Sequence, residues 1–230
     1  MAELIDNKTK LLGDDLKETI QPGDKVSIIA SVFTVYAFEE LKEQLESLSE
    51  LDFIFSSPAF AKKIINGVDK KPKEFMISEA FSQTSIYGID FELKLRNQLS
   101  QKAISKECAE WIKEKVHFKV NISDQEAIGF LEVEKSYSAN GDVASNPLVS
   151  GFSNDSLGYL KTNQPHTGTT KIGANEGALY LIKTFDNLWN DKEKVEDVTD
   201  AVENYIKRSN ELKKLDYQIG KTEKAIQFEK

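Results

Sequence analysis

Two kinds of hydrophobic pattern alternate in the first third of the chain. Residues 25–33 are almost continuously apolar, which predicts a strand covered on both faces. Residues 36–48 predict an amphipathic helix, because apolar positions recur every three or four residues: Phe38, Leu41, Leu45 and Leu48. Residues 51–57 and 74–78 are again short and apolar. This strand, helix, strand order predicts a right-handed crossover on a parallel sheet.

The rest of the chain changes from strands to helices. Residues 91–115 keep an approximately helical spacing of apolar residues, which predicts a long helix. Short apolar runs between polar loops then predict four strands: residues 116–122, 127–133, 147–152 and 177–185. From Asp186 onward apolar residues recur at helical steps in an evenly charged background. The pattern therefore predicts an α/β fold with a C-terminal helical extension.

Composition narrows the cellular setting. The chain has 230 residues, 40% of them hydrophobic, which is enough for one substantial core. Its single cysteine, Cys108, excludes an internal disulfide framework and, with 30% charged residues, favours a reducing compartment. The N-terminus lacks the pattern of a signal peptide, and no apolar stretch is long enough for a membrane span. We therefore expect a cytoplasmic protein without a membrane partner.

The charge of the chain limits its contact with nucleic acid. A net charge of −8 opposes wholesale wrapping of a phosphate backbone, so any such contact must be local. The best candidate is a basic cluster near a predicted turn: Lys62, Lys63, Lys70, Lys71 and Lys73. A solvated, lysine-rich loop accounts for the same residues.

Several common chemistries are excluded or weakly supported. The two histidines, His117 and His166, and one cysteine cannot form a zinc site of the usual Cys/His kind, and no metal site is predicted. The chain contains no phosphate-binding loop of the NTPase type. Residues 166–177 are rich in small residues and could cradle an anion, but a flexible loop is the favoured interpretation.

Several short segments resemble, in their order and spacing, a known domain. They are residues 4–7 (Leu-Ile-Asp-Asn), 23–33, 107–112, 129–131, 151–154 (Gly-Phe-Ser-Asn) and 185–191. Together they resemble the phospholipase D-like domain that precedes the motor of certain bacterial superfamily-two (Swi/Snf-type) helicases. The resemblance covers most of residues 1–191 and implies a mixed sheet flanked by helices. Residues 192–230 would then form an amphipathic, charged helical tail and a linker to a motor.

The resemblance also implies a chemistry. In that family a His-x-Lys pair on one strand is followed by Gly-Ser-x-Asn and a downstream Glu. The histidine attacks phosphorus, and the lysine, serine and asparagine stabilise the phosphoryl oxygens. A second histidine must protonate the leaving oxygen, so a domain with one copy of the site works as a homodimer.

This sequence departs from the family pattern at the decisive positions. In the frame set by residues 129–131, Glu132 and Glu134 stand where histidine and lysine are expected. Of the Gly-Ser-x-Asn element, the sequence keeps Gly151, Ser153 and Asn154. Glu176 stands where the downstream glutamate is expected. Two carboxylates would repel a phosphodiester, so the scaffold is interpreted as kept and the catalyst as lost.

A second register stays open. His117 and Lys119, followed by Asp124, satisfy the literal pattern His-x-Lys-x-x-x-x-Asp, and on a strand the first two point to one face. No Gly-Ser-x-Asn follows at the expected distance. An ordinary strand that alternates polar and apolar faces explains the same spacing.

Three functions follow. The leading hypothesis is a noncatalytic or weakly catalytic accessory domain that recruits nucleic acid or a protein, without a cofactor of its own; ATP and Mg²⁺ would belong to a helicase motor in the same longer chain. The second is a metal-independent, homodimeric phosphodiesterase or nuclease using His117 and Lys119. The third is an interaction module whose C-terminal helix pairs with a partner through Val195, Val198, Val202, Tyr205, Leu212 and Leu215.

Overall fold

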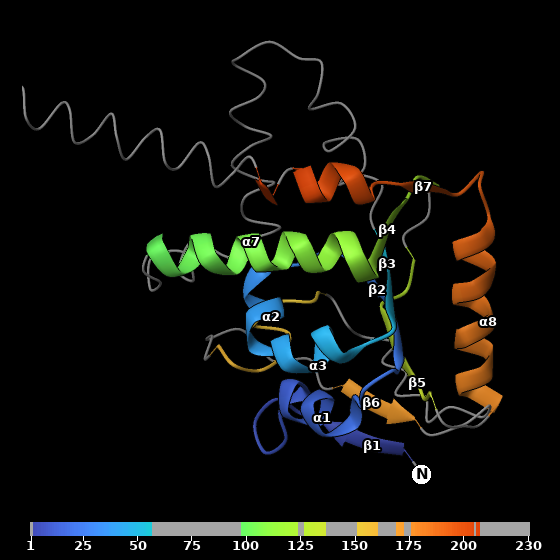
Figure 1. The fold of residues 1–230 in the computed structure, drawn as a ribbon. Helices are drawn as coiled ribbons and strands as arrows, with labels where there is room; N and C mark the ends of the chain where they lie inside the picture. Colours follow the sequence, from blue (N-terminus) through green and yellow to red (C-terminus); the bar gives the residue numbers. More distant parts are fainter. Residues whose placement is uncertain are drawn as a thin grey trace, which may run out of the picture.

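The computed structural model describes residues 2–56, 98–123, 127–136, 151–160, 169–172, 176–204 and 206–207. The predicted strand at residues 74–78 and the lysine cluster at residues 62–73 lie outside these ranges, as do residues 91–97 of the predicted long helix. Within them, helices cover both faces of a central sheet, which Figure 1 shows almost edge-on.

The central sheet has five described strands in the order β5-β2-β3-β4-β7. Their bounds are Lys25–Ala30 for β2, Glu50–Phe55 for β3, Val116–Asn121 for β4, Phe130–Glu134 for β5 and Val195–Asp197 for β7. The three inner strands are parallel, and β5 and β7 are antiparallel to their neighbours. This mixed α/β sheet confirms the predicted fold class and the predicted strands at residues 25–33, 51–57 and 116–122.

The helices divide unequally between the two faces. One face carries α1 (Leu12–Thr19), α2 (Val35–Glu40), α3 (Lys42–Ser47) and α7 (Gln98–Lys115). The other face carries α8 (Glu176–Asn190). A separate two-stranded sheet joins β1 (Ala2–Ile5) to β6 (Thr169–Ile172). Among the described residues, no helix combines the length and the apolar character that crossing a membrane requires.

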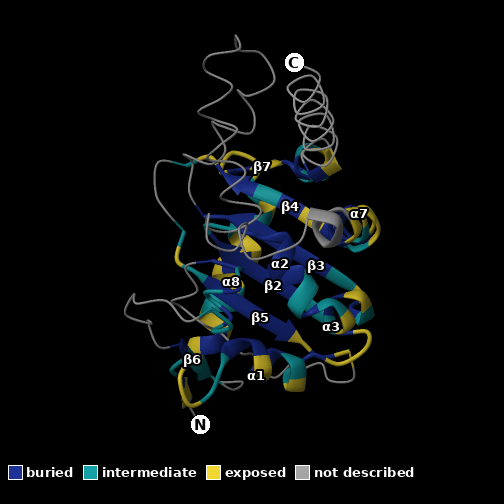
Figure 2. Ribbon diagram, turned by 90° about the vertical axis from the view of Figure 1, so that its left-hand side faces the viewer, coloured by how far each residue is buried: buried dark blue, intermediate teal, exposed yellow. Residues whose placement is uncertain are grey.

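Successive side chains of each strand point to opposite faces of the sheet and pack in two separate hydrophobic cores. Val26 and Ile28 of β2 face the larger core beneath α1, α2 and α7, while Ile29 faces the smaller core beneath α8. Both sets are buried, which is why residues 25–33 are apolar at nearly every position. Figure 2 shows the buried strands running through the middle of the molecule.

Phe33 is the centre of the larger core. Its ring lies 5.2 Å from Phe118 of β4 and 5.9 Å from Phe53 of β3, measured between ring centroids. It also stacks on Trp111 of α7 at 6.4 Å and on Phe152 at 6.0 Å. One side chain thus joins two strands, a helix and the loop around residue 152.

The predicted helix at residues 36–48 is broken in two. Leu41 has φ −112° and ψ 18°, so it ends α2 and begins α3. The hydroxyl of Thr34 caps α2 by accepting a hydrogen bond from the backbone N–H of Ala37. Leu41 and Leu45 are both buried, so the apolar spacing is satisfied by two short helices instead of one.

The predicted strand at residues 177–185 is wrong, because this segment belongs to α8. Phe185 packs on Phe130 and Trp189, and its ring centroid lies 5.6 Å and 5.7 Å from theirs. The apolar run at residues 178–182 is too short for its periodicity to separate a strand from a buried helix. Packing against β5 decided the outcome.

The start of the predicted C-terminal tail belongs to the fold. Val195 begins β7, which pairs with β4, and residues 199–204 and 206–207 are helical. Val198, Val202 and Ile206 are buried in the larger core. These three residues of the predicted tail therefore pack in the larger core, and Val195 packs in the smaller one.

We expect Phe33→Ala to destabilise the protein strongly, because it removes the ring on which four others pack. The free energy of unfolding should fall by about 3–5 kcal/mol, measured by urea denaturation. The matched control is Ile128→Ala, since Ile128 is 67% exposed. An equal effect of the two substitutions would contradict the central place of Phe33.

Candidate functional site

Charged residues occupy two adjacent rungs of the central sheet, where a rung is a row of directly paired residues on neighbouring strands. The first rung pairs Glu132, Ser27, Asp52 and His117 across β5, β2, β3 and β4. The second pairs Glu134, Lys25 and Glu50. Residues two apart on a strand share a face, so all of these side chains point to the α8 face. We call Lys25, Glu50, Asp52, His117, Glu132 and Glu134 the charged cluster.

Lys25 bridges two carboxylates of the charged cluster. Its Nζ lies 2.7 Å from Oδ2 of Asp52 and 2.8 Å from Oε2 of Glu50. Burial raises the pKa of Asp52, and the ammonium of Lys25 only partly offsets this. The hydrogen bond from Lys25 lowers the pKa of Glu50, which is more exposed.

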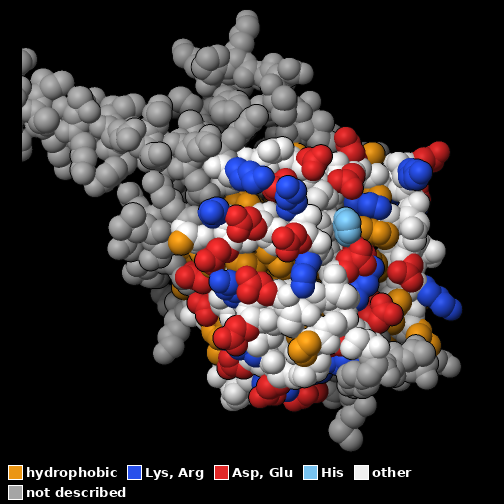
Figure 3. Space-filling model, viewed as in Figure 1, with side chains coloured by type: hydrophobic (Ala, Val, Ile, Leu, Met, Phe, Trp, Pro, Cys, Tyr) orange, Lys and Arg blue, Asp and Glu red, His pale blue; other side chains and the backbone are white. Residues whose placement is uncertain are grey.

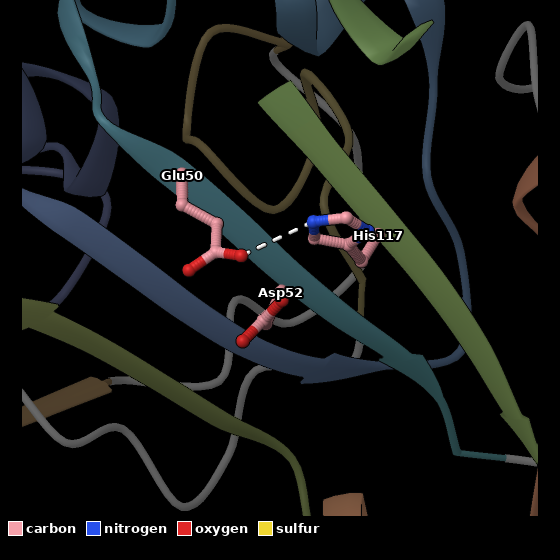
Figure 4. Close-up of side chains that lie close together, drawn as sticks. All are labelled: Glu50, Asp52 and His117. Atoms are coloured by element: carbon pink, nitrogen blue, oxygen red, sulfur yellow. Dashed lines mark ion pairs between the residues drawn. The ribbon is translucent and has the colours of Figure 1, made fainter. Parts of the chain in front are cut away.

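His117 completes this side of the cluster. Its Nε2 lies 3.1 Å from Oε1 of Glu50, the oxygen that Lys25 does not hold. Figure 4 shows the imidazole of His117 on β4 facing the carboxylates of Glu50 and Asp52 on β3. The side chain of His117 is 53% exposed. The face of the molecule seen in Figure 3 carries acidic and basic side chains intermixed.

Glu132 is the most perturbed carboxyl of the cluster. It is only 7% exposed, and burial raises its pKa to about 7. The negative charges of Glu134 and Asp186 add to this increase, and the charge of Lys25 opposes it. Glu132 therefore gains and loses a proton near neutral pH, which suits a proton carrier but not a phosphate-binding group.

The loop formed by residues 151–160, here called the Ser153 loop, lies at the other end of β2. Phe152 forms a parallel bridge with Phe33, and the Ser153 hydroxyl lies 3.1 Å from that of Ser156. The side chain of Asn154 is buried, and its Oδ1 has no hydrogen-bond partner among the described residues. This loop holds the predicted elements Gly151, Ser153 and Asn154.

Asn7 attaches the N-terminal segment to the Ser153 loop. Its Nδ2 donates to the carbonyl of Ser156 at 2.9 Å, and its Oδ1 accepts from the backbone N–H of Leu12 at 2.8 Å. Gly158 has φ 86°, and a Cβ there would lie 2.7 Å from Oδ1 of Asn7. Two segments far apart in the sequence, residues 4–7 and 151–158, are thus built as one unit.

The structure does not bring the charged cluster and the Ser153 loop together. Glu132 pairs with Ser27, whereas Phe152 pairs with Phe33, six residues further along the same segment (27 to 33). Only residues 25–30 of this segment are strand, and six fully extended residues would span at most roughly 20 Å. Among the described residues, no hydrogen bond or ion pair joins Glu132 or Glu134 to Ser153 or Asn154.

The alternative pair His117 and Lys119 is divided as well. His117 faces Glu50, while the Lys119 Nζ lies 4.0 Å from the ring centroid of Trp189 and donates to its carbonyl at 2.9 Å. Asp124 lies outside the described residues. Glu176 begins α8, but its side chain is outside the described part.

Cys108 is buried in the larger core, and burial raises the pKa of its thiol. Burial of this kind is typical of a structural thiol and not of a nucleophile.

Sequence reasoning missed Lys25, Glu50 and Asp52. Glu50 and Asp52 alternate on one strand, which is a weak signal, and they meet His117 only through the register of β3 with β4. One ligand atom each from Glu50, Asp52 and His117 lies within 4.8 Å of the others, so these three residues could hold a metal ion.

The comparisons with known proteins give little beyond this description. No family model matches the chain, and no curated protein matches it. A solved structure, the phosphatidylserine synthase of Haemophilus influenzae Rd KW20, is similar over 98% of this chain, with 9% sequence identity and a TM-score of 0.47. The matched part is 46% of that chain, so this chain spans about half its length. The fold class follows from the strand order and the helices of this chain itself.

We expect Glu132 to make stability depend on pH. The pKa is raised from 4.5 to about 7 on folding, so between these values the folded state binds more protons than the unfolded state. The free energy of unfolding should therefore fall as pH rises through this window, by roughly 2–3 kcal/mol.

Glu132→Gln should remove this dependence, and urea denaturation at pH 5 and pH 8 measures it. From pH 5 to pH 8, the free energy of unfolding of the variant should rise by roughly 2 kcal/mol relative to that of the wild type. Glu110→Gln, at an exposed position of α7, is the matched control. A wild-type and a Glu132→Gln profile that run parallel would show that Glu132 is not the group responsible.

Proposed function

We propose that this chain is a phospholipase D-like accessory domain that does not cleave phosphodiesters and that recruits nucleic acid to a larger helicase-like protein. The ordered segments of the sequence support the family. The joining of residues 4–7 to the Ser153 loop through Asn7 supports it further, since both segments belong to the resemblance.

One observation supports the proposal that the domain does not cleave phosphodiesters. The groups that phosphodiester cleavage would need are spread over separate places: Ser153 and Asn154 beside Phe33, His117 on Glu50, and Lys119 on Trp189. Attack on phosphorus requires the nucleophile and the charge-stabilising groups to converge on one phosphate. The negative charges of Glu134 and Asp186 near Glu132 would also repel a phosphodiester.

The described structure offers less support to the helix-pairing alternative. That hypothesis uses Val195, Val198 and Val202, and all three are buried in the fold. Tyr205, Leu212 and Leu215 lie outside the described residues. A partner that bound the first three would have to unfold part of the core.

We expect the purified protein to show no phosphodiesterase activity, because its catalytic groups do not converge. The measurement uses bis-p-nitrophenyl phosphate and labelled single-stranded and double-stranded DNA and RNA, each with EDTA and with Mg²⁺. His117→Ala and Lys119→Ala serve as reference variants. Cleavage in EDTA that the wild type performs and both variants lose would overturn the proposal in favour of an active enzyme.

We expect the lysine cluster of residues 62–73 to carry the contact with nucleic acid. Changing Lys62, Lys63, Lys70, Lys71 and Lys73 to Gln should weaken binding of a labelled oligonucleotide at least about tenfold and flatten its salt dependence. The matched control changes five exposed lysines of the described part to Gln: Lys8, Lys106, Lys113, Lys183 and Lys192. Equal losses in the two variants would point to nonspecific charge, and the absence of wild-type binding would reject recruitment of nucleic acid.

A further inference from the structure

Three residues of the charged cluster, Glu50, Asp52 and His117, could bind a metal ion together although Lys25 contacts one oxygen of each carboxylate. Lys25 holds Oδ2 of Asp52 and Oε2 of Glu50. Lys25 does not contact Oδ1 of Asp52, which has no hydrogen-bond partner among the described residues, or Oε1 of Glu50, which faces Nε2 of His117. One atom from each residue lies within 4.8 Å of the other two, and the Glu50–His117 pair is already at 3.1 Å.

The buried oxygen of Asp52 is a second, independent observation. The Asp52 side chain is only 4% exposed, yet its Oδ1 has no hydrogen-bond partner among the described residues. A buried carboxylate oxygen without a partner is costly, so such groups usually have a proton, a water or a cation against them. Figure 4 shows the carboxylate of Asp52 beside the side chains of Glu50 and His117.

We propose that Glu50, Asp52 and His117 bind a divalent transition-metal ion of the zinc type, with Lys25 retained on the outer carboxylate oxygens. The ion would take the place between Nε2 of His117 and Oε1 of Glu50 and would satisfy Oδ1 of Asp52. Solvent would complete the coordination, since three protein ligands leave one tetrahedral position open.

The geometry needs only small movements. Zinc bonds to imidazole nitrogen and carboxylate oxygen are about 2.0–2.2 Å, which sets ligand atoms roughly 3.5 Å apart. Asp52 is fixed by burial, while Glu50 and His117 are 38% and 53% exposed and can rotate toward it. Contraction by about 1 Å is therefore available from the two surface side chains.

The charge and the donor atoms select the kind of ion. Two carboxylates against one ammonium leave a net negative charge at the site, and Glu132 and Glu134 lie on the same rungs. An imidazole ligand favours zinc, cobalt or nickel over Mg²⁺ and Ca²⁺, which prefer oxygen alone. Glu50 and Asp52 are far from His117 in the sequence and meet it only through the register of β3 with β4.

The site would tie β3 to β4 at their amino-terminal ends. Glu50 and Asp52 come from β3, and His117 comes from the neighbouring strand. Binding to the folded state alone raises its stability by mass action. This inference does not rest on the proposed function, since it uses no residue of the Ser153 loop or of the lysine cluster.

The test measures Zn²⁺ binding to tag-free protein by calorimetry, after treatment with EDTA and its removal. We expect one equivalent of Zn²⁺ to bind, and Mg²⁺ at the same concentration to give no comparable heat. His117→Ala and Glu50→Gln should each weaken Zn²⁺ binding at least about tenfold. The matched controls, His166→Ala and Glu46→Gln, should bind as the wild type does.

A spectroscopic readout separates metal ligation from a general effect on folding. The chain has two histidines, so the ring signals of His117 can be assigned by comparing wild type with His166→Ala. Zn²⁺ should shift the Nε2 signal of His117 and leave that of His166 in place. Melting temperatures measured in EDTA show whether the variants are folded.

Two results would overturn the proposal. One is the absence of stoichiometric Zn²⁺ binding to the folded wild-type protein. The other is binding that both His117→Ala and Glu50→Gln leave unchanged, which would place the ion elsewhere. Neither result bears on phosphodiester cleavage or on oligonucleotide binding, so failure of this site and failure of the proposed function are distinguishable.

Discussion

The hydrogen-bonded register of β2 with β3 and β5 sets which side chains meet on each face of the central sheet. It aligns Glu132, Ser27 and Asp52 on one rung, to which the register of β3 with β4 adds His117, and it sets Lys25 against Glu50 on the next. A shift of β2 by one residue would turn Lys25 and Ser27 away from this face. The same register puts Val26 and Ile28 into the larger core, so apolar burial there fixes the positions of the charges on the other side.

The α8 face of the sheet is divided along the strands. At the amino-terminal ends of β2 and β3 it carries the charged cluster, and toward their carboxyl ends it carries Ile29, Ile54 and the rings of α8. Lys119 lies at the boundary, where its ammonium sits over the Trp189 ring. Burial of carboxylates in this arrangement is costly, which explains the raised pKa values of Asp52 and Glu132. A face of this kind holds cations and protons more readily than phosphate.

The Ser153 loop occupies the opposite end of β2 and is organised independently of the charged cluster. Phe152 anchors it on Phe33, and Asn7 fixes its far side through Ser156. Its buried Asn154 has an oxygen without a partner, as Asp52 has. Asp52 lies on β3 and Asn154 in the loop that bridges to Phe33, and no hydrogen bond or ion pair among the described residues joins the two. This separation is the physical reason for proposing a binding role over a catalytic one.

The sequence by itself determined the α/β class, the buried strands at residues 25–33, 51–57 and 116–122, and the long helix ending at Lys115, because each has a distinct hydrophobic period. It also marked residues 4–7 and 151–154 as parts of one pattern. Only the tertiary structure decided that Leu41 divides a helix, that residues 177–185 are helical and that Val195 opens a strand. In each case packing against a distant element chose between local alternatives. Above all, strand register decided that His117 meets Glu50 and Asp52 instead of Ser153, because contacts across a sheet depend on pairing between segments far apart in the chain.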